Sequence, residues 1–300
     1  MSFTLAHLSD SHIGPVPRPS LKQLAGKRGL GYINWRRGRR RTHDMALLAR
    51  LVADIVAQKP DHVAMTGDIL NIGLPAEFPG AAAWLATLGS PRDVSFTPGN
   101  HDAYTRDAMP HLAATFAPWV EGDEGGHASF PFLRVRGDIA LIGLCSGLPT
   151  GALMATGQLG AAQLARLDRM LQETRERNLA RVVMIHHPPL RRGAAPMRRL
   201  VDANALEAVL TRAGAELLLH GHNHVSSLDF LKSPASRAVS GRMPILGAPS
   251  ASSGSRAPRS HAAYHLLRLE RSGGAWRIFG HARGPLADSR EIGELREIST

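Results

Sequence analysis

Short apolar runs alternate with longer segments of helical spacing over the first hundred residues. The runs Thr4–Leu8, His62–Thr66 and Asp93–Thr97 have the length and the apolar character of buried strands. Between them, His43–Gln58 carries its apolar side chains on one helical face, and Ala76–Leu88 predicts a second helix. Strands that alternate with helices favour parallel pairing with right-handed crossovers, so this part of the chain is expected to form an α/β fold.

The alternation continues along the rest of the chain, with a change of pattern at its end. Two apolar runs that meet at Gly137-Asp138 predict an antiparallel pair, Phe132–Val135 and Ile139–Leu144. The elements expected next are the longest helix Leu159–Asn178, a strand Arg181–Ile185, a helix Ala203–Arg212 and a strand Glu216–Leu219. The C-terminal portion, 225–300, has short extended segments separated by Gly, Pro and Ser, which predict mostly antiparallel strands.

Nothing in the sequence divides this pattern into separate parts. We find no repeat and no linker, so residues 1–300 are expected to form a single domain. Ser250–Ser260 has the composition of a mobile surface loop beside a site. No apolar run approaches the ~18 residues of a membrane-spanning helix, and the chain enters a strand pattern without a signal-peptide layout. The expected location is therefore the cytoplasm.

Five of the predicted strands end in side chains that can bind a metal ion. In chain order these groups are Asp10 and His12; Asp68; Asn100, His101 and Asp102; His186 and His187; and His220, His222 and His224. In an open α/β sheet, ligands bind beyond the carboxyl ends of the strands, where the loops converge. One histidine after a strand is more often a hydrogen-bonded loop residue than a ligand. Repetition at successive strand ends favours one shared metal site instead.

The spacing and the types of these side chains indicate which ions they bind. Alternate residues of an extended backbone point the same way, so Asp10 and His12 can bind one ion, and His222 and His224 have the same separation. A mixture of imidazole, carboxylate and carboxamide suits Mn, Fe or Zn better than Ca or Mg, which prefer oxygen alone. The choice among Mn, Fe and Zn stays open.

Together these groups form five blocks in a defined order. The blocks are Asp10-Ser11-His12, Gly67-Asp68, Gly99-Asn100-His101-Asp102, His186-His187-Pro188 and Gly221-His222-Asn223-His224. The series resembles the signature of calcineurin-like metallophosphoesterases and spans residues 10–224. The resemblance implies a four-layer αββα sandwich of mixed sheets with a dinuclear metal site.

The resemblance also implies a role for each matching residue. The ligands of the first ion would be Asp10, His12, Asp68 and His224. The ligands of the second ion would be Asp68, Asn100, His186 and His222, so that Asp68 bridges the pair. His101 would stabilise or protonate the leaving oxygen, and Asp102 would orient the His101 ring. For His187 and His220 we expect supporting roles outside the ligand set.

The excess positive charge is partly concentrated in one segment. The chain has 36 Lys and Arg against 25 Asp and Glu, a net charge of +11. Seven of the basic residues lie between Gly26 and Arg41, with no acidic residue among them and with Tyr32, Ile33 and Trp35 interleaved. This basic insertion, 26–41, is expected either to be a solvated loop or to contact a phosphate-bearing substrate, an anionic membrane surface or nucleic acid.

The favoured function is hydrolysis of a phosphodiester. Two ions ~3.5–4 Å apart can clamp the phosphate and hold a bridging hydroxide in line, so no Ser or Cys nucleophile is required. The blocks are similar to those of bacterial enzymes that act on cyclic nucleotides or glycerophosphodiesters. The same blocks serve phosphomonoesterases, so that activity is an alternative.

Three further functions stay open. The basic and aromatic residues of the insertion favour a peripheral membrane enzyme, similar to family members that cleave the pyrophosphate of a UDP-linked lipid A precursor. A nuclease is less favoured, because no recognisable nucleic-acid module accompanies the basic segment. The non-enzyme alternative is an inactive metal-binding scaffold, and it is disfavoured because every expected ligand position is unaltered. The sequence makes no prediction of the oligomeric state.

Overall fold

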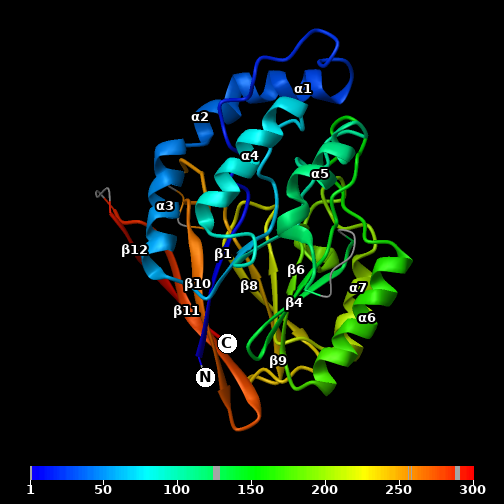
Figure 1. Ribbon diagram of the computed structural model, residues 1–300, viewed down its shortest axis with the longest axis vertical. Helices are drawn as coiled ribbons and strands as arrows, with labels where there is room; N and C mark the ends of the chain where they lie inside the picture. Colours follow the sequence, from blue (N-terminus) through cyan, green and yellow to red (C-terminus); the bar gives the residue numbers. More distant parts are fainter. Residues whose placement is uncertain (1, 124–128, 256, 258, 288–290) are drawn as a thin grey trace.

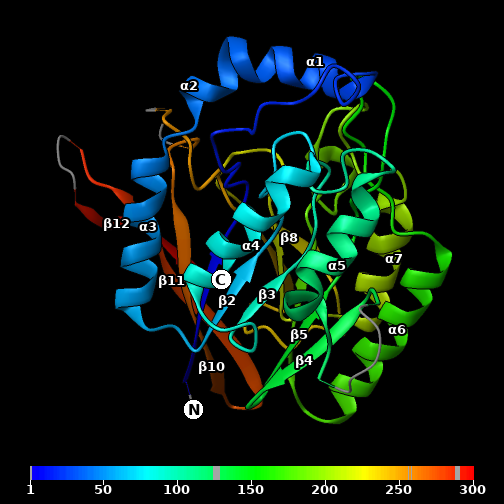
Figure 2. The same ribbon diagram turned by 45° about the horizontal axis from the view of Figure 1, so that its top comes forward.

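Two six-stranded sheets pack face to face, with helices on both outer faces (Figure 1 and Figure 2). This computed structural model describes residues 2–123, 129–255, 257, 259–287 and 291–300. The first sheet, in the order β12-β11-β10-β1-β2-β3, contains β1 Ser2–Leu8, β2 His62–Met65, β3 Val94–Phe96, β10 Tyr264–Ser272, β11 Ala275–Pro285 and β12 Ile292–Ser299. The second, in the order β4-β5-β6-β7-β9-β8, contains β4 Phe132–Arg136, β5 Ile139–Gly143, β6 Ala180–Met184, β7 Leu217–His220, β8 Ser227–Lys232 and β9 Arg242–Gly247.

Helices cover the outer face of each sheet. The helices on the first sheet are α3 Met45–Gln58, α4 Phe78–Leu85 and α5 Ala108–Val120, and those on the second are α6 Ala161–Glu176 and α7 Ala203–Ala213. Short 3-10 turns lie at Pro75–Glu77, Ala86–Leu88 and Arg191–Gly193.

Three layers of apolar packing separate the four layers of elements. Along β6, Val182 and Met184 face the core between the sheets, whereas Val183 and, just after the strand, Ile185 face the core beneath α6 and α7. Successive side chains of a strand point to opposite faces, so each central strand supplies two cores. This arrangement confirms the predicted αββα sandwich of mixed sheets.

Most of the expected strand pairings are confirmed. The pairs β1–β2, β2–β3, β5–β6 and β6–β7 are parallel, and β4–β5 is antiparallel. Most strand pairs after residue 225 are antiparallel, although β9 pairs in parallel with β7. The helix α5 was not predicted, because Pro110 and Pro118 disguise its pattern. Pro110 is tolerated because the first helical turn needs no N–H donors, while Leu112 and Phe116 lie in the core.

The basic insertion is helical and not a loop, although Arg36, Arg37, Arg40 and Arg41 are exposed to solvent as the solvated alternative expected. It contains α1 Lys27–Asn34, a π-helical turn Trp35–Arg39 and α2 Arg40–Thr42. Two of its side chains are buried in the protein, Arg28 at 5% exposure and Trp35 at 8%. Figure 2 shows α1 and α2 crossing the top of the molecule, above the ends of the strands.

The expected surface loop at Ser250–Ser260 begins inside the protein. Ser250, Ser252 and Ser253 are buried, and Ser250 Oγ donates a hydrogen bond of 2.6 Å to the carbonyl oxygen of Asp10. The first part of this segment therefore supports the strand end after β1, and residues 256 and 258 lie outside the described residues. Within the described part of the chain, no helix has the length and apolar character needed to cross a membrane.

Candidate metal centre

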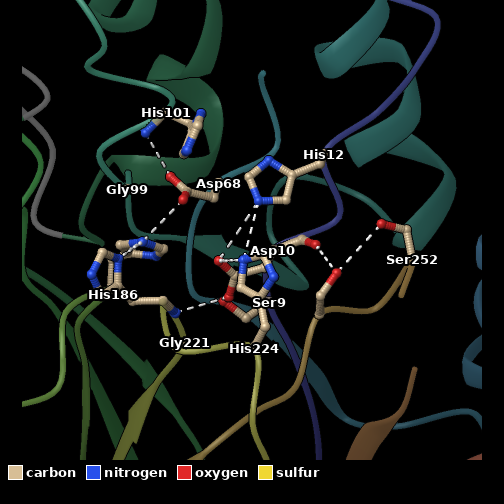
Figure 3. A network of polar contacts seen from close by, with 12 residues as sticks. Ser9, Asp10, His12, Asp68, Gly99, His101, His186, Gly221, His224 and Ser252 are labelled. Carbon is tan, nitrogen blue, oxygen red and sulfur yellow. Dashed lines mark hydrogen bonds and ion pairs between the residues drawn. The ribbon is translucent and has the colours of Figure 1, made fainter. Parts of the chain in front are cut away.

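The metal-competent side chains meet at one edge of the sandwich. Each follows the carboxyl end of a strand: Asp10 and His12 after β1, Asp68 after β2, Asn100 to Asp102 after β3, His186 after β6, and His222 and His224 after β7. Three of these strands belong to the first sheet and two to the second. The site therefore forms where the two sheets present their parallel strand ends together (Figure 3).

One group of ligand atoms converges around Asp10. Its Oδ1 lies 3.1 Å from His224 Nε2 and 4.0 Å from His12 Nε2, and the two imidazole nitrogens are 3.3 Å apart. Figure 3 shows the three side chains pointing toward one another. These three residues could hold one metal ion.

A second group converges around Asp68. His186 Nε2 lies 3.3 Å from Asp68 Oδ2 and 3.2 Å from His222 Nδ1. Asp68 also lies with His12 and His101 in a group whose candidate ligand atoms are all within 4.8 Å of one another. The carboxylate of Asp68 therefore faces ligands on both sides.

The tautomers of two histidines show that this site fits a cation. His12 Nδ1 lies 3.0 Å from the Leu70 carbonyl oxygen, and His186 Nδ1 lies 2.7 Å from the Thr66 carbonyl oxygen. Each ring donates its Nδ1 proton to the carbonyl, so each Nε2 presents a lone pair toward a carboxylate. Two acceptors that face each other need a cation or a proton between them.

An amide oxygen in the same site also lacks a donor. The side chain of Asn100 is 2% exposed, and its Oδ1 has no hydrogen-bond partner among the described residues. A buried acceptor without a donor is costly, and a metal ion would satisfy it. The donor set of Asn100, the aspartates and the histidines therefore fits one or two metal ions.

The charges around Asp68 and His186 also indicate a site for a cation. Burial raises the pKa of Asp68, but His186, His101 and His12 outweigh it and hold that pKa well below its usual range. Burial lowers the pKa of His186, but the charges of Asp68 and Asp10 outweigh it and raise that pKa to about 9. In the metal-free protein, His186 therefore holds a proton that a metal ion would displace.

The backbone of the strand-end loops is strained at these residues. Positive φ angles between 39° and 69° occur at Asp10, His12, Asp68, His222 and His224. They are five of the eight non-glycine residues with positive φ in the described chain, a conformation that such residues seldom adopt. Strain at a cluster of polar side chains is typical of a functional site, because the surrounding structure must enforce it.

The glycine before Asn100 lets two loops approach closely. A Cβ atom on Gly99 would lie 2.2 Å from Asp68 Oδ1, a distance that no side chain tolerates. The Gly99-Asn100 step therefore depends on the missing side chain.

Asp102 does not orient the His101 ring, contrary to the sequence-based prediction. Its Oδ2 accepts hydrogen bonds from the N–H groups of Asp68 at 2.7 Å and Gly99 at 2.8 Å. Its Oδ1 accepts from the N–H groups of Ile69 and Leu70, both at 3.0 Å. Burial and the charge of Asp68 raise the pKa of Asp102 to about 7. Asp102 joins the loops after β2 and β3, and it holds the backbone of Asp68 in place.

The His101 ring is held by two other groups. Its Nδ1 contacts the carbonyl oxygen of Asn71, and its Nε2 lies 2.8 Å from Arg39 Nη1. Burial and the nearby Arg39 charge lower the pKa of His101 to about 3, so the ring is neutral. With Nδ1 donating to Asn71, Nε2 accepts from the guanidinium of Arg39.

Three side chains at this site had no specific prediction from the sequence. A cavity of about 290 Å³ above Asp68 is lined by Arg39, His43 and Arg198, together with the motif residues. His43 Nδ1 lies 2.7 Å from Ser252 Oγ, and Arg198 Nη2 donates to the His222 carbonyl oxygen at 3.1 Å. No local pattern marks these residues; Arg39 belongs to the basic insertion, and its place at His101 is a tertiary contact.

A second cavity of about 300 Å³ adjoins the first beneath α1. The two share the lining residues Arg39, Asn100, His101, Ala155 and Arg198. His101 and Arg39 therefore lie at the boundary between the two cavities.

The two remaining histidines of the motifs are buried in supporting positions. His187 Nδ1 lies 2.8 Å from Ser146 Oγ, and His220 Nδ1 lies 3.1 Å from the Gly221 carbonyl oxygen. Neither belongs to a group of converging ligand atoms in the described residues.

Comparison with known proteins identifies relatives of this chain. Glycerophosphodiester phosphodiesterase GpdQ of Enterobacter lignolyticus is 29% identical over 187 residues, which cover 57% of this chain and 61% of GpdQ. A probable cyclic nucleotide phosphodiesterase of Synechococcus is 25% identical over 280 residues, which cover 92% of this chain and 91% of that protein. The chain thus matches less than two thirds of the first relative and most of the second.

Solved structures share the fold at low sequence identity. A dimetal phosphatase from Danio rerio has a TM-score of 0.62 at 14% identity, over 99% of this chain and 98% of its own. A purple acid phosphatase from yellow lupin seeds has a TM-score of 0.59 at 9% identity, over 100% of this chain and 54% of its own.

The family assignment comes from the sequence match. A profile of the calcineurin-like phosphoesterases matches residues 3–226, from β1 to the loop after β7. This match includes all five motif blocks and most of the chain. The protein therefore belongs to the calcineurin-like phosphoesterase family of metal-dependent phosphoesterases.

Proposed function

We propose that this protein hydrolyses phosphodiesters at a dinuclear metal centre. The observation that carries the proposal is the pair of converging ligand groups on either side of Asp68. The proposed ligands of the first ion are Asp10, His12, Asp68 and His224, and those of the second are Asp68, Asn100, His186 and His222.

The chemistry would be shared between the ions and the protein. Two bound ions, proposed as Mn, Fe or Zn from the mixed nitrogen and oxygen donors, would supply Lewis acidity and activate the attacking water. The carbonyl groups of Leu70 and Thr66 hold the rings of His12 and His186 with Nε2 directed inward. The Asp102 carboxylate holds the backbone of Asp68 by accepting a hydrogen bond from its N–H group.

Arg39 and His101 are proposed to act on the leaving oxygen. Because the neutral His101 ring accepts from Arg39, its Nε2 has no proton to give. Arg39 can instead turn its guanidinium to the departing oxygen and stabilise the negative charge there. We therefore favour electrostatic stabilisation by Arg39, positioned by His101, over protonation by His101.

The adjoining cavity favours a diester over a monoester. A diester carries a second organic group, and the cavity of about 300 Å³ beside His101 can accept it. Three basic side chains, Lys27, Arg39 and Arg198, line that cavity, and among the described residues no acidic side chain does. The relatives that are named as phosphodiesterases support the same choice.

The test compares two chromogenic substrates with Mn added to the metal-free protein. We expect faster hydrolysis of bis(p-nitrophenyl) phosphate than of p-nitrophenyl phosphate, with loss of both activities after chelation. Faster hydrolysis of the monoester would replace the proposal with a phosphomonoesterase. Bound metal without hydrolysis of either substrate would indicate an inactive scaffold.

A further inference from the structure

The excess positive charge of the chain lies in segments that contribute to the candidate metal centre. Three segments that contribute to the two cavities, 11–43, 145–157 and 185–201, contain 13 of the 36 Lys and Arg and none of the 25 Asp and Glu. The rest of the chain has 23 basic and 25 acidic side chains. The net charge of +11 therefore comes entirely from these three segments.

One side of α1 is firmly attached to the protein. The Arg28 guanidinium forms an ion pair of 2.6 Å with Asp107 and donates to the Gly73 carbonyl oxygen, also at 2.6 Å. Trp35 packs in an apolar cluster that includes Tyr104. Lys27 Nζ donates to Thr150 Oγ1 at 2.6 Å, which joins α1 to the 145–157 segment. Figure 2 shows α1 lying across the end of the molecule, with a green loop rising beside it.

The same three segments also expose large apolar side chains. Seven of the ten exposed large hydrophobic residues of the described chain lie in the three segments: Leu21, Leu30, Ile33, Leu153, Met154, Met197 and Val201. Leu30, Leu153 and Met154 line one cavity, and the N–H of Ala155 donates to the carbonyl oxygen of Met197. Leu30 of α1 and Leu153 and Met154 of the 145–157 segment therefore border the cavity from two different parts of the chain, and Met197 lies next to the second of them.

Leu153 is exposed at a position that does not favour leucine for stability. Its side chain is 80% exposed, and its φ of 64° is unfavourable for leucine. Neither burial of the side chain nor the preferred backbone conformation of leucine accounts for a leucine at this position.

We propose that the three segments form a docking surface for an anionic lipid bilayer, with α1 at the interface and the cavity mouth facing the lipid. Exposed apolar side chains beside exposed arginines, here Arg36, Arg37, Arg40 and Arg41, are the combination by which helices bind at a bilayer surface. The arginines attract anionic headgroups and the apolar side chains enter the interface. This docking does not depend on which phosphoester the site cleaves.

A nucleic acid fits the surface less well than a bilayer. Single-stranded nucleic acid is bound by stacking on exposed aromatic rings. Trp35 is 8% exposed, and Tyr32 stacks on it with 5.8 Å between the ring centroids. A polyanion would pair with the arginines but would leave Leu21 and Leu153 uncovered.

The test is co-sedimentation of the full chain with lipid vesicles. We expect binding to vesicles that contain phosphatidylglycerol, little binding to phosphatidylcholine alone, and weaker binding as salt screens the charges. Arg36→Glu with Arg37→Glu should weaken binding roughly tenfold or more. Leu21→Ser with Ile33→Ser should weaken binding without changing the charge, so it tests docking even if the charge variant fails to fold.

Matched controls lie on other faces of the protein. Arg166→Glu with Arg169→Glu makes the same charge change on exposed residues of α6, away from α1 (Figure 1), and Val56→Ser with Leu295→Ser removes exposed apolar side chains elsewhere. Both controls should bind vesicles as the parent does. Equal losses in the controls, or no vesicle binding by the parent, would overturn the proposal. Binding of a single-stranded oligonucleotide without binding of vesicles would also overturn it.

Hydrolysis separates this proposal from the proposed function. Arg36 and Arg37 line neither cavity, so their variant should still hydrolyse bis(p-nitrophenyl) phosphate. Docking without hydrolysis would contradict only the proposed phosphodiesterase activity. Hydrolysis without docking by the parent protein would contradict only the docking surface.

Discussion

The strand-end loops and the helical segment, which is the basic insertion 26–41, border the same cavity, but they are held in place in different ways. The loops are held by backbone hydrogen bonds, as where Asp102 accepts four amide protons, and by left-handed backbone at the proposed ligands. The helical segment is held by a few side chains, chiefly Arg28 and Trp35. Damage to the loops should therefore abolish the chemistry, whereas damage to the segment should change how substrate is held.

The largest expected effect is in the loops, at Asp68, the residue that is proposed to bind both ions. Asp68→Ala should lose bound metal and reduce hydrolysis to background, because the proposed site uses that carboxylate as a ligand of both ions. Metal content and turnover of the purified variant provide the measurement. Asp229→Ala, at an exposed carboxylate on β8, is the control and should resemble the parent. Normal metal content in Asp68→Ala would contradict the proposal that Asp68 bridges two ions.

The next effect is in the helical segment, at the residue that reaches His101. Arg39→Ala should keep its metal and lose about 10²–10³-fold in kcat, the usual cost of removing a charge stabiliser. Arg40→Ala, at an exposed neighbour, is the control and should keep its activity. His101→Ala should also keep metal and lose turnover. Unchanged turnover in Arg39→Ala would mean that His101 or water, and not Arg39, stabilises the leaving oxygen.

The third prediction concerns stability of the loops. Asp102→Ala leaves four buried amide groups without an acceptor, so the free energy of unfolding should fall by about 3 kcal/mol or more. Urea denaturation measures the change, and Asp102→Asn should fall between the parent and Asp102→Ala. A variant as stable as the parent, with only turnover reduced, would restore a role for Asp102 at the His101 ring.

The fourth prediction is a pH dependence in the loops. Since the pKa of His186 is raised to about 9, a proton competes with metal below that pH, and metal affinity should rise with pH. One proton predicts about a tenfold gain in Mn affinity per pH unit from near neutrality to about 9, with a plateau above it. Equilibrium dialysis at several pH values measures this, and His186→Gln should lose the dependence. Affinity that stays constant across the window would contradict the protonated histidine.

The smallest effect should follow from loosening the helical segment. Arg28→Ala removes the ion pair with Asp107 and leaves the Ile72 and Gly73 carbonyl oxygens without this donor. We expect normal metal content and a KM for the diester that is raised roughly tenfold, from the usual worth of charged hydrogen bonds. Arg41→Ala, on the exposed side of the segment, is the matched control. Loss of metal in Arg28→Ala would show that the two regions are not separable.

The sequence by itself predicted the elements that depend on local patterns. A buried strand followed at once by Asp, His or Asn is visible in neighbouring residues, as in the runs that end at Asp10 and Asp68. The parallel pairing of these strands then brings their ends to one edge, so the candidate ligands could be grouped before their distances were known.

Only the tertiary structure decided the features that join distant residues. Arg39 contacts His101 across 62 positions, and His43 contacts Ser252 across 209, so no local spacing could reveal either pair. The segment around α1 carries Gly29, Gly31 and Gly38, which disfavour a helix, and it becomes helical because Arg28 and Trp35 are buried against other elements. Asp102 is adjacent to His101 in sequence but faces the amides of another loop. Adjacent residues on a turn point in different directions, and only packing decides which partner each one meets.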